Sequence, residues 1–224
     1  MPVQAQVIAD QNTPQVVRFV PQRVIEYRKR KRMLDIIGAC LLALVLSPVI
    51  VLTALLVWLT SPGPVVYMSK RVGICGRVFR FYKFRSMYLD ADERLAALKA
   101  SNEKDGPIFK MKHDPRITPV GRFIRKFSLD ELPQIWNVLQ GDMSLVGPRP
   151  PLVHEVQQYD DYQMQRLSVR PGLTCYWQIM GRSDLSFEEW MDLDHKYMEE
   201  MSFSRDLKIL LMTPWAVIRG KGAY

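Results

Sequence analysis

The sequence has few cysteines and histidines, and this limits the metal and disulfide sites that it can build. Its three cysteines are odd in number and far apart: Cys40, Cys75 and Cys175. Neither a disulfide framework nor a zinc ribbon is expected from such spacing. The three histidines are equally scattered, so a histidine-based metal site is not expected either. This cysteine usage favours a protein whose working face lies in the cytosol.

The sequence contains only one long apolar run. Residues 36–59 carry no charge, and as a helix they are long enough to cross about 30 Å of hydrocarbon. A single run of this kind excludes a polytopic lipid-phosphate transferase. We therefore expect one membrane segment, over residues 33–60.

The middle and the flanks of this segment predict its topology. Ser47-Pro48 lies at the middle, where proline removes a backbone hydrogen bond and bends a helix. Basic residues flank the segment on both sides: Arg28 to Arg32 before it, and Lys70, Arg71, Arg77, Arg80, Lys83 and Arg85 after it. The positive-inside rule then places both flanks in the cytoplasm. A re-entrant helix–break–helix satisfies this rule, whereas the alternative, a simple kinked transmembrane anchor with a basic outer domain, does not.

The rest of the chain predicts an α/β fold that is mostly helical with a small sheet. Residues 1–32 lack clear periodicity and end in the basic cluster, so we expect an N-terminal tail, and 61–224 a cytosolic domain of ordinary size. Residues 78–85 alternate basic and apolar side chains, as in a strand. Helices are expected over 90–102, over 133–139, over the helically spaced positions 187–201 and, lying in the membrane interface, over 207–218.

Two adjacent acids, Asp130 and Glu131, stand behind a basic run in a chain of formal charge +8. One interpretation makes them a nucleophile and a metal ligand in phosphate chemistry. The other makes Ser128 a helix cap that forms a capping box with Glu131. Pro133 weakens the second interpretation, because its ring would disturb a first turn that began at Ser128. A helix that begins near Pro133 would leave both acids on a strained, accessible approach.

Two arginines stand in proline-braced loops, Gly147-Pro148-Arg149-Pro150-Pro151 and Arg170-Pro171-Gly172. Proline lowers the entropy lost when a loop becomes ordered, so each arginine would be presented in one orientation to a doubly bonded anion. The alternative is a pair of rigid turns with solvated arginines.

With these blocks in order, the chain from about Lys31 to Tyr224 resembles the bacterial sugar transferases, which are monotopic polyprenyl-phosphate phosphoglycosyl transferases. The resemblance rests on Ser47-Pro48, on the two arginine loops and on three further blocks: Lys70-Arg71-Val72-Gly73, Lys83-Phe84-Arg85-Ser86-Met87 and Arg125 to Gln134. The chain is similar to the compact, exopolysaccharide-initiating members. Cys175 and Tyr176 stand where the family usually has glycine, which leaves the sugar preference open but not the reaction.

The resemblance implies a reaction and roles for named residues. A hexose 1-phosphate would pass from a UDP-sugar, UDP-glucose or UDP-galactose, to undecaprenyl phosphate, with release of UMP and an aspartyl-phosphosugar intermediate on Asp130. Asp130 and Glu131 would be the catalytic pair and the ligands of a Mg²⁺ cofactor, with a role in proton transfer also open for Glu131. Phosphates would be held by Lys83, Arg85, Arg125, Arg149 and Arg170.

The resemblance also implies a place in the cell, the bacterial inner membrane, with lipid as a partner and the site on the cytoplasmic face. This reaction would be the first membrane step of exopolysaccharide or related glycan synthesis. The oligomeric state, homo-oligomer or monomer, stays open. Two alternatives from other classes are a membrane-tethered binder of nucleic acid or anionic lipid, suggested by the basic excess, and a scaffold that has lost catalysis. The intact acid pair argues against both, so no nucleic-acid partner is expected.

Overall fold

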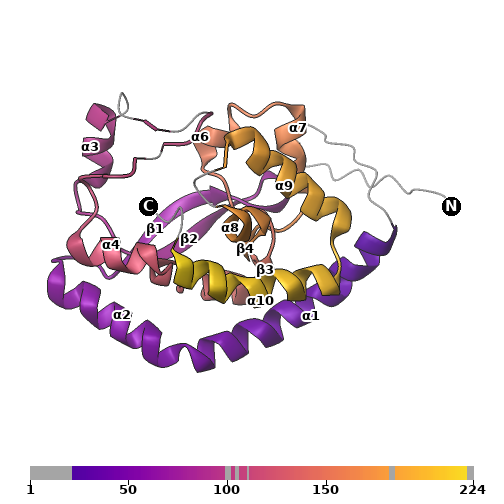
Figure 1. Cartoon of the computed structure of the whole chain (residues 1–224), viewed down its shortest axis with the longest axis horizontal. Coiled ribbons are helices and arrows are strands. Elements are labelled where there is room, and N and C mark those ends of the chain that lie inside the picture. Colours follow the sequence, from indigo (N-terminus) through magenta and orange to yellow (C-terminus); the bar gives the residue numbers. More distant parts are fainter. Residues whose placement is uncertain (1–21, 99–101, 104–105, 110, 182–184, 221–224) are drawn as a thin grey trace.

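The structure is a computed structural model that describes residues 22–98, 102–103, 106–109, 111–181 and 185–220 (Figure 1). Its helices and strands bear out a mostly helical α/β chain, and the sheet is divided into two pairs of strands, β1–β2 and β3–β4. The bent pair of helices α1 and α2 forms the lower edge of the molecule in Figure 1, and the other elements lie above it.

Helix α1 (Gln22–Val45) and helix α2 (Ser47–Thr60) meet at the break that was predicted from Ser47-Pro48. The Ser47 hydroxyl donates to the carbonyl O of Leu44 at 2.8 Å, so the serine bonds to a backbone group at the bend. Within the described residues no single helix has the length and hydropathy of a membrane span. The segments Glu26–Val45 and Ser47–Thr60, bent by 62° to one another, reach them only as a pair.

Many apolar side chains of this helix pair face outward, whereas others, such as Ala39 and Val57, pack against the core. Leu44 is 74% exposed, Val45 70% and Trp58 63%, so the pair is not the buried core helix of a soluble protein. Helix α1 begins at Gln22, inside the segment that we expected to be a tail, and the basic cluster is therefore helical. The reason is that several of its side chains bond to the rest of the domain.

Strands β1 (Val66–Val72) and β2 (Val78–Phe84) form an antiparallel hairpin in which Val66 pairs with Phe84 and Val72 with Val78. A 3₁₀ turn, η1 (Ile74–Gly76), joins them. The strand predicted over 78–85 is confirmed. Helix α3 (Ala91–Leu98) follows, in place of the longer helix predicted over 90–102, of which residues 99–101 lie outside the described part.

Helix α4 (Pro119–Lys126) packs closely against the end of β2. A Cβ built on Gly121 would lie 1.8 Å from the carbonyl O of Ser86, so only glycine allows this approach. The chain then passes through the 3₁₀ turn η3 (Leu129–Glu131) into helix α5 (Gln134–Gln140), which the sequence predicted. Gly141 ends α5 at φ 90°, in the left-handed region that glycine adopts at low cost.

The second half of the chain supplies a parallel strand pair and the remaining helices. Strand β3 (Ser144–Val146) pairs with β4 (Gly172–Thr174). The helical segments between and after them are α6 (Val153–Val156), α7 (Asp161–Met164), η4 (Gln165–Ser168), α8 (Tyr176–Met180), α9 (Phe187–Glu200) and α10 (Phe203–Arg219). Helices α9 and α10 confirm the two helices predicted there. Helix α10 exposes Leu211 (71%) and Ile218 (66%), as an interfacial helix would, but that location stays a prediction.

The main core joins the hairpin, α5, β3, α9 and α10. It contains Phe81 of β2, Val138 of α5, Val146 of β3, Tyr197 of α9 and Ile209 of α10, all nearly inaccessible to solvent. Helix α5 therefore lies among the other elements, and the turn that precedes it is fixed by core packing.

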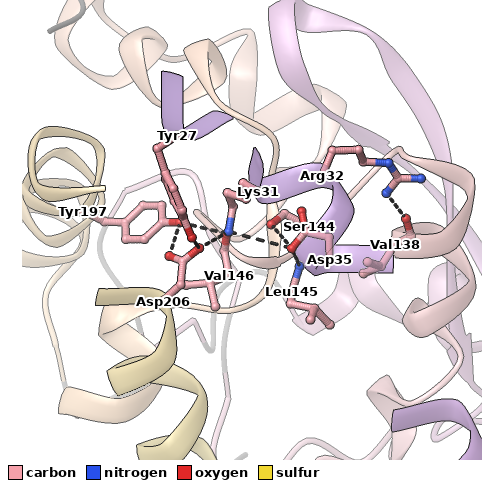
Figure 2. Close-up of polar contacts among 10 residues, drawn as sticks. All are labelled: Tyr27, Lys31, Arg32, Asp35, Val138, Ser144, Leu145, Val146, Tyr197 and Asp206. Carbon is pink, nitrogen blue, oxygen red and sulfur yellow. Dashed lines mark hydrogen bonds and ion pairs between the residues drawn. The ribbon is translucent and has the colours of Figure 1, made fainter. Parts of the chain in front are cut away.

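A buried polar network fastens α1 to this core (Figure 2). Lys31 Nζ forms an ion pair with Asp206 at the start of α10, and the Tyr27 hydroxyl donates to the same carboxylate at 2.6 Å. The Tyr197 hydroxyl donates to the other oxygen of Asp206 at 2.8 Å. Asp35 Oδ1 accepts from Ser144 Oγ at 2.9 Å and from the backbone N–H of Leu145 at 3.0 Å.

The network also reaches the end of α5. Arg32 Nη1 and Nη2 donate to the carbonyl oxygens of Val138 and Leu139 at 2.5 and 2.8 Å. These carbonyls belong to the last turn of a helix, where a cation is favourable. The basic cluster therefore holds the apolar helix pair in one orientation relative to α5.

Replacing Lys31 with methionine should lower the free energy of unfolding by about 3–5 kcal/mol, because Asp206 would stay buried without its cation. Lys29→Met, on an exposed position of the same helix, is the matched control and should change little. Denaturant titration of the detergent-purified variants measures both. Equal stability of the two variants would contradict the structural role of the network.

Candidate active site

A cavity of about 680 Å³ opens beside the β1–β2 hairpin, a size typical of small-molecule sites. The hairpin, η3, the loop after β3 and helix α8 contribute to its wall. Polar and charged residues that line it include Ser69, Arg71, Lys83, Arg85, Arg125, Asp130, Glu131, Arg149 and Gln178, and farther along the wall Asp92, Asp114, Arg116, His154 and Glu155. A cavity that combines so many cations with two adjacent carboxylates suits an anionic ligand such as a diphosphate.

Asp130 and Glu131 belong to η3, and the local backbone decides between the two interpretations of this motif. Ser128 has φ 53° and ψ 22°, and its side chain makes no capping hydrogen bond, so the capping-box interpretation is wrong. Helix α5 begins at Gln134, after Pro133, as the alternative predicted. The left-handed conformation of Ser128 costs an L-residue roughly 1–2 kcal/mol. The backbone that leads into η3 is thus strained, as predicted. Asp130 is less accessible than predicted, because it is only 4% exposed and lines the cavity.

Glu131 is the most heavily bonded group of the site. Its Oε1 lies 2.7 Å from Lys83 Nζ and 3.0 Å from Arg149 Nη1. Its Oε2 accepts from Gln178 Nε2 at 3.4 Å. Burial alone would raise the pKa of Glu131, but the two cations outweigh burial and hold it well below its usual range. Glu131 is therefore a fixed anion between two cations.

Asp130 is buried as well but far less engaged. Its one ion pair within the described part of the chain is with Lys83 Nζ, at 3.6 Å from Oδ2. Burial raises the pKa of Asp130, the neighbouring Glu131 raises it further, and Lys83, Arg125 and Arg149 oppose the shift. The two adjacent carboxylates therefore differ in their environment: one is neutralised by protein cations, and the other faces the cavity with bonding capacity to spare.

Lys83 reaches this position from β2, and its ammonium group is shared between the two acids. Burial lowers the pKa of Lys83, while Glu131 and Asp130 raise it. Its Nζ also lies 5.6 Å from the ring centroid of Phe81, over an aromatic face that attracts cations.

Two arginine side chains hold the backbone at Arg149 and at the next residue. Arg166 Nη2 donates to the carbonyl O of Arg149 at 2.9 Å, and Arg71 Nη1 donates to that of Pro150 at 3.0 Å. Arg166 is itself 2% exposed and pairs with Asp194 at 2.7 Å. The loop therefore holds Arg149 in a fixed position, as its prolines predicted.

The structure places the other sequence-predicted arginines differently. Arg85 and Arg125 line the cavity, and Arg85 Nη2 also bonds to the carbonyl O of Ser61 at the end of α2. Arg170 does not line the cavity. A phosphate contact for Arg170 stays a prediction without geometric support, and we do not carry it further.

Arg71, Trp177 and Gln178 are among the cavity residues that were not predicted as site residues. The Trp177 ring lies 5.9 Å from the guanidinium carbon of Arg149. Arg71 stood in a block that carried the family resemblance, and Gln178 stood in the stretch that departs from it, but a single sequence offers no signal that residues so far apart line one cavity with the acid pair. Only the fold brings them together.

The residues present fit a divalent cation of the hard, oxygen-seeking kind. Within the described residues no cluster of three His, Cys, Asp or Glu side chains could hold a metal. Mg²⁺, however, is commonly held by one or two carboxylates together with phosphate oxygens and water. Asp130 and Glu131 supply such a pair at the cavity wall, and Asp130 has the freer oxygens.

Comparison with known proteins gives one family. The family described as bacterial sugar transferase matches residues 26–220. Galactosyl transferase CpsE of Streptococcus agalactiae is 47% identical over 194 residues, which cover 86% of this chain and 43% of that protein. Undecaprenyl-phosphate galactose phosphotransferase of Salmonella typhimurium is 43% identical over 204 residues, covering 87% of this chain and 41% of that protein.

A relative of similar length is exopolysaccharide production protein ExoY of Rhizobium meliloti. It is 39% identical over 214 residues, which cover 92% of this chain and 95% of ExoY. The chain thus spans less than half the length of the first two relatives and nearly the whole of the third.

Arg166→Met should lower the free energy of unfolding by about 3–5 kcal/mol, because it leaves Asp194 buried without a cation. The matched control is Arg205→Met, whose pair with Glu200 has side chains 41% and 32% exposed. That change should cost less than about 1 kcal/mol. A chemical denaturation series compares them. A small effect of Arg166→Met would show that the loop of Arg149 does not depend on the buried pair.

Proposed function

The chain belongs to the bacterial sugar transferase family, and from this premise we propose that it transfers a hexose 1-phosphate from a UDP-sugar to undecaprenyl phosphate. The observation that carries the proposal is the pair of unlike carboxylates in one cationic cavity. Glu131 is neutralised by Lys83 and Arg149, whereas Asp130 keeps free bonding capacity next to the same cations. An anionic nucleophile surrounded by phosphate-binding groups suits phosphoryl transfer.

The first half-reaction follows from this geometry. A carboxylate oxygen of Asp130 attacks the sugar-linked phosphorus, an O–P bond forms, and the bond from that phosphorus to the oxygen of UMP breaks. UMP leaves as the anion, so no proton has to be moved. Lys83 and Arg149 lie where they stabilise the negative charge on the phosphoryl oxygens during transfer.

The second half-reaction regenerates the enzyme. A phosphate oxygen of undecaprenyl phosphate attacks the phosphorus of the aspartyl-phosphosugar, and the bond to Asp130 breaks. The carboxylate returns to its place beside Lys83, and the lipid carries the hexose 1-phosphate. Because an acyl phosphate is reactive, this step need not be strongly uphill.

Asp130 and Glu131 are the residues that would hold Mg²⁺, together with oxygens of the diphosphate. When bound, Mg²⁺ neutralises charge on the diphosphate and on the leaving phosphate. Glu131 has a second role that needs no metal, because it keeps Lys83 and Arg149 in fixed positions.

The donor is proposed to be UDP-galactose, with UDP-glucose as the other candidate. Two of the relatives are named for galactose transfer, and a third is named for exopolysaccharide production. We accordingly propose that the reaction initiates exopolysaccharide synthesis. Purified protein incubated with polyprenyl phosphate and a panel of UDP-sugars should release UMP with one of these two donors, and release with neither would overturn the proposal.

We also propose that the bent pair α1–α2 enters and leaves the cytoplasmic leaflet of the inner membrane. Three observations support this: the 62° bend, the exposed apolar side chains and the basic flanks at both ends. The cavity would then lie at the interface, where a soluble donor and a lipid acceptor can meet.

Asp130→Asn should reduce turnover by at least about 10³-fold, since removal of a catalytic nucleophile commonly costs this much or more. The change removes the anion at nearly constant shape, so folding and membrane binding should be retained. UMP release measures turnover, and Asp161→Asn, at an exposed position of α7, is the control. Near-normal rates in Asp130→Asn would refute the covalent mechanism.

Cysteines placed at Glu26 and at Arg77, in a variant lacking Cys40 and Cys75, should not react with an impermeant thiol reagent added to intact cells. Both should react after the membrane is permeabilised, since both flanks are proposed to be cytoplasmic. Adding Pro48→Leu, which restores a helix former at the bend, should shift the segment toward spanning. Labelling of the cysteine at position 77 in intact cells without that change would contradict the re-entrant topology.

A further inference from the structure

One face of the β1–β2 hairpin lines the cavity, and only one of its charged residues has been given a role. In the antiparallel register Tyr67 pairs with Lys83, Ser69 with Phe81 and Arg71 with Phe79, so these six side chains share a face. Five of them line the cavity: Tyr67, Ser69, Arg71, Phe81 and Lys83. Arg71 is the second cation of this face.

The contacts of Arg71 leave part of its guanidinium without a bond in the described part of the chain. Its Nη1 donates to the carbonyl O of Pro150 at 3.0 Å, and its guanidinium carbon lies 5.1 Å from the ring centroid of Phe81. Its Nε is buried without a hydrogen bond, and none of the ion pairs in the described part of the chain includes it. Ser69 Oγ, two residues earlier on the same face, is also buried without a hydrogen bond.

The surroundings of Arg71 would favour the binding of an anion. Burial and the charge of Arg149 lower the pKa of Arg71 to about 10, and Glu155, Tyr67 and Glu131 offset only part of that shift. Two acids of the cavity, Glu155 and Glu131, act on Arg71, but neither forms an ion pair with it in the described part of the chain. Glu131 is already bonded to Lys83 and Arg149, and Glu155 accepts from the backbone N–H of Leu152 at 2.8 Å. An anionic ligand in the cavity would relieve this unfavourable arrangement.

The positions of Lys83 and Arg71 along the cavity indicate which part of the ligand Arg71 would bind. Lys83 lies against Asp130, the proposed nucleophile, and also against Phe81. Arg71 lies against the same ring but bonds to Pro150, next to Arg149. The phosphorus under attack belongs near Asp130, Lys83 and Arg149, so Arg71 is left for the phosphate attached to it.

In-line displacement adds a constraint. The group that leaves phosphorus departs opposite Asp130, and the group that later displaces Asp130 must attack from that same side. The leaving nucleotide phosphate and the incoming lipid phosphate therefore use one position in turn. Both are phosphate monoesters with the same chemistry.

Resting on the proposed function, we propose that Arg71, assisted by the Ser69 hydroxyl, forms a phosphate-monoester subsite that the leaving nucleotide and the lipid acceptor occupy in turn. The guanidinium donates to the oxygens of whichever phosphate is present and neutralises its charge. One cation thus serves the leaving group in the first half-reaction and the nucleophile in the second.

The test measures each half-reaction separately. Lipid-free enzyme with Mg²⁺ and UDP-galactose should exchange labelled UMP into the UDP-sugar, because UMP attacks the aspartyl-phosphosugar and regenerates the donor. Discharge of that intermediate by polyprenyl phosphate is followed in a second assay. Arg71→Met should raise both the KM for UMP and the KM for polyprenyl phosphate about 10–100-fold, as expected when one charge-assisted hydrogen bond is lost. Arg71→Lys should recover part of both.

Arg80→Met is the matched control, because Arg80 lies in the same hairpin on an exposed position outside the cavity lining. It should leave both KM values unchanged. If Arg71 only supported the loop of Pro150, both rates at saturating substrate would fall while neither KM rose, and the proposal would be refuted. A rise in only one of the two KM values would refute the shared subsite.

Failure of the wider proposal gives a different result. If wild-type enzyme shows no lipid-independent exchange of UMP, the covalent mechanism fails whatever Arg71 does. Normal exchange in the wild type with unchanged KM values in Arg71→Met overturns the subsite alone.

Discussion

The ion pairs of Glu131 are the interaction on which the rest of the site depends. Lys83 comes from β2 and Arg149 from the loop after β3, and both meet on one carboxylate oxygen. Without that anion, two cations would face each other in a partly buried cavity, which is unfavourable unless a ligand is present. Because Glu131 meets this need, its neighbour Asp130 does not have to, and one acid of the pair is free for chemistry.

Buried ion pairs and hydrogen bonds also connect the apolar helix pair to the elements that carry the site. Lys31, Arg32 and Asp35 of α1 bond respectively to α10, to the end of α5 and to the start of β3 (Figure 2). Helix α5 follows η3 directly, so the helix that is proposed to enter the membrane and the turn that carries the proposed catalytic pair share a rigid support. A soluble donor and a lipid acceptor need such a fixed relation between cavity and membrane surface.

The sequence predicted local features well and long-range ones poorly. Proline and glycine signals located the bend at Ser47-Pro48 and the limits of α5, because these residues act on their own backbone. The different environments of Asp130 and Glu131 could not be predicted, since adjacent acids differ only through partners that lie 18 to 48 residues away. Arg71 and Gln178 were missed as site residues for the same reason, and Arg170, whose loop resembles that of Arg149, does not reach the cavity.

The central claim is that Asp130 carries the hexose phosphate between the two substrates. Mass spectrometry of the intact protein, incubated with UDP-galactose or UDP-glucose and Mg²⁺ but without lipid, tests it most directly. The account predicts an added mass of one hexose phosphate, located on the peptide that contains Asp130 and removed by hydroxylamine or by polyprenyl phosphate. Turnover in the presence of lipid, with no adduct and no UMP release in its absence, would contradict the account and would indicate direct transfer in a ternary complex.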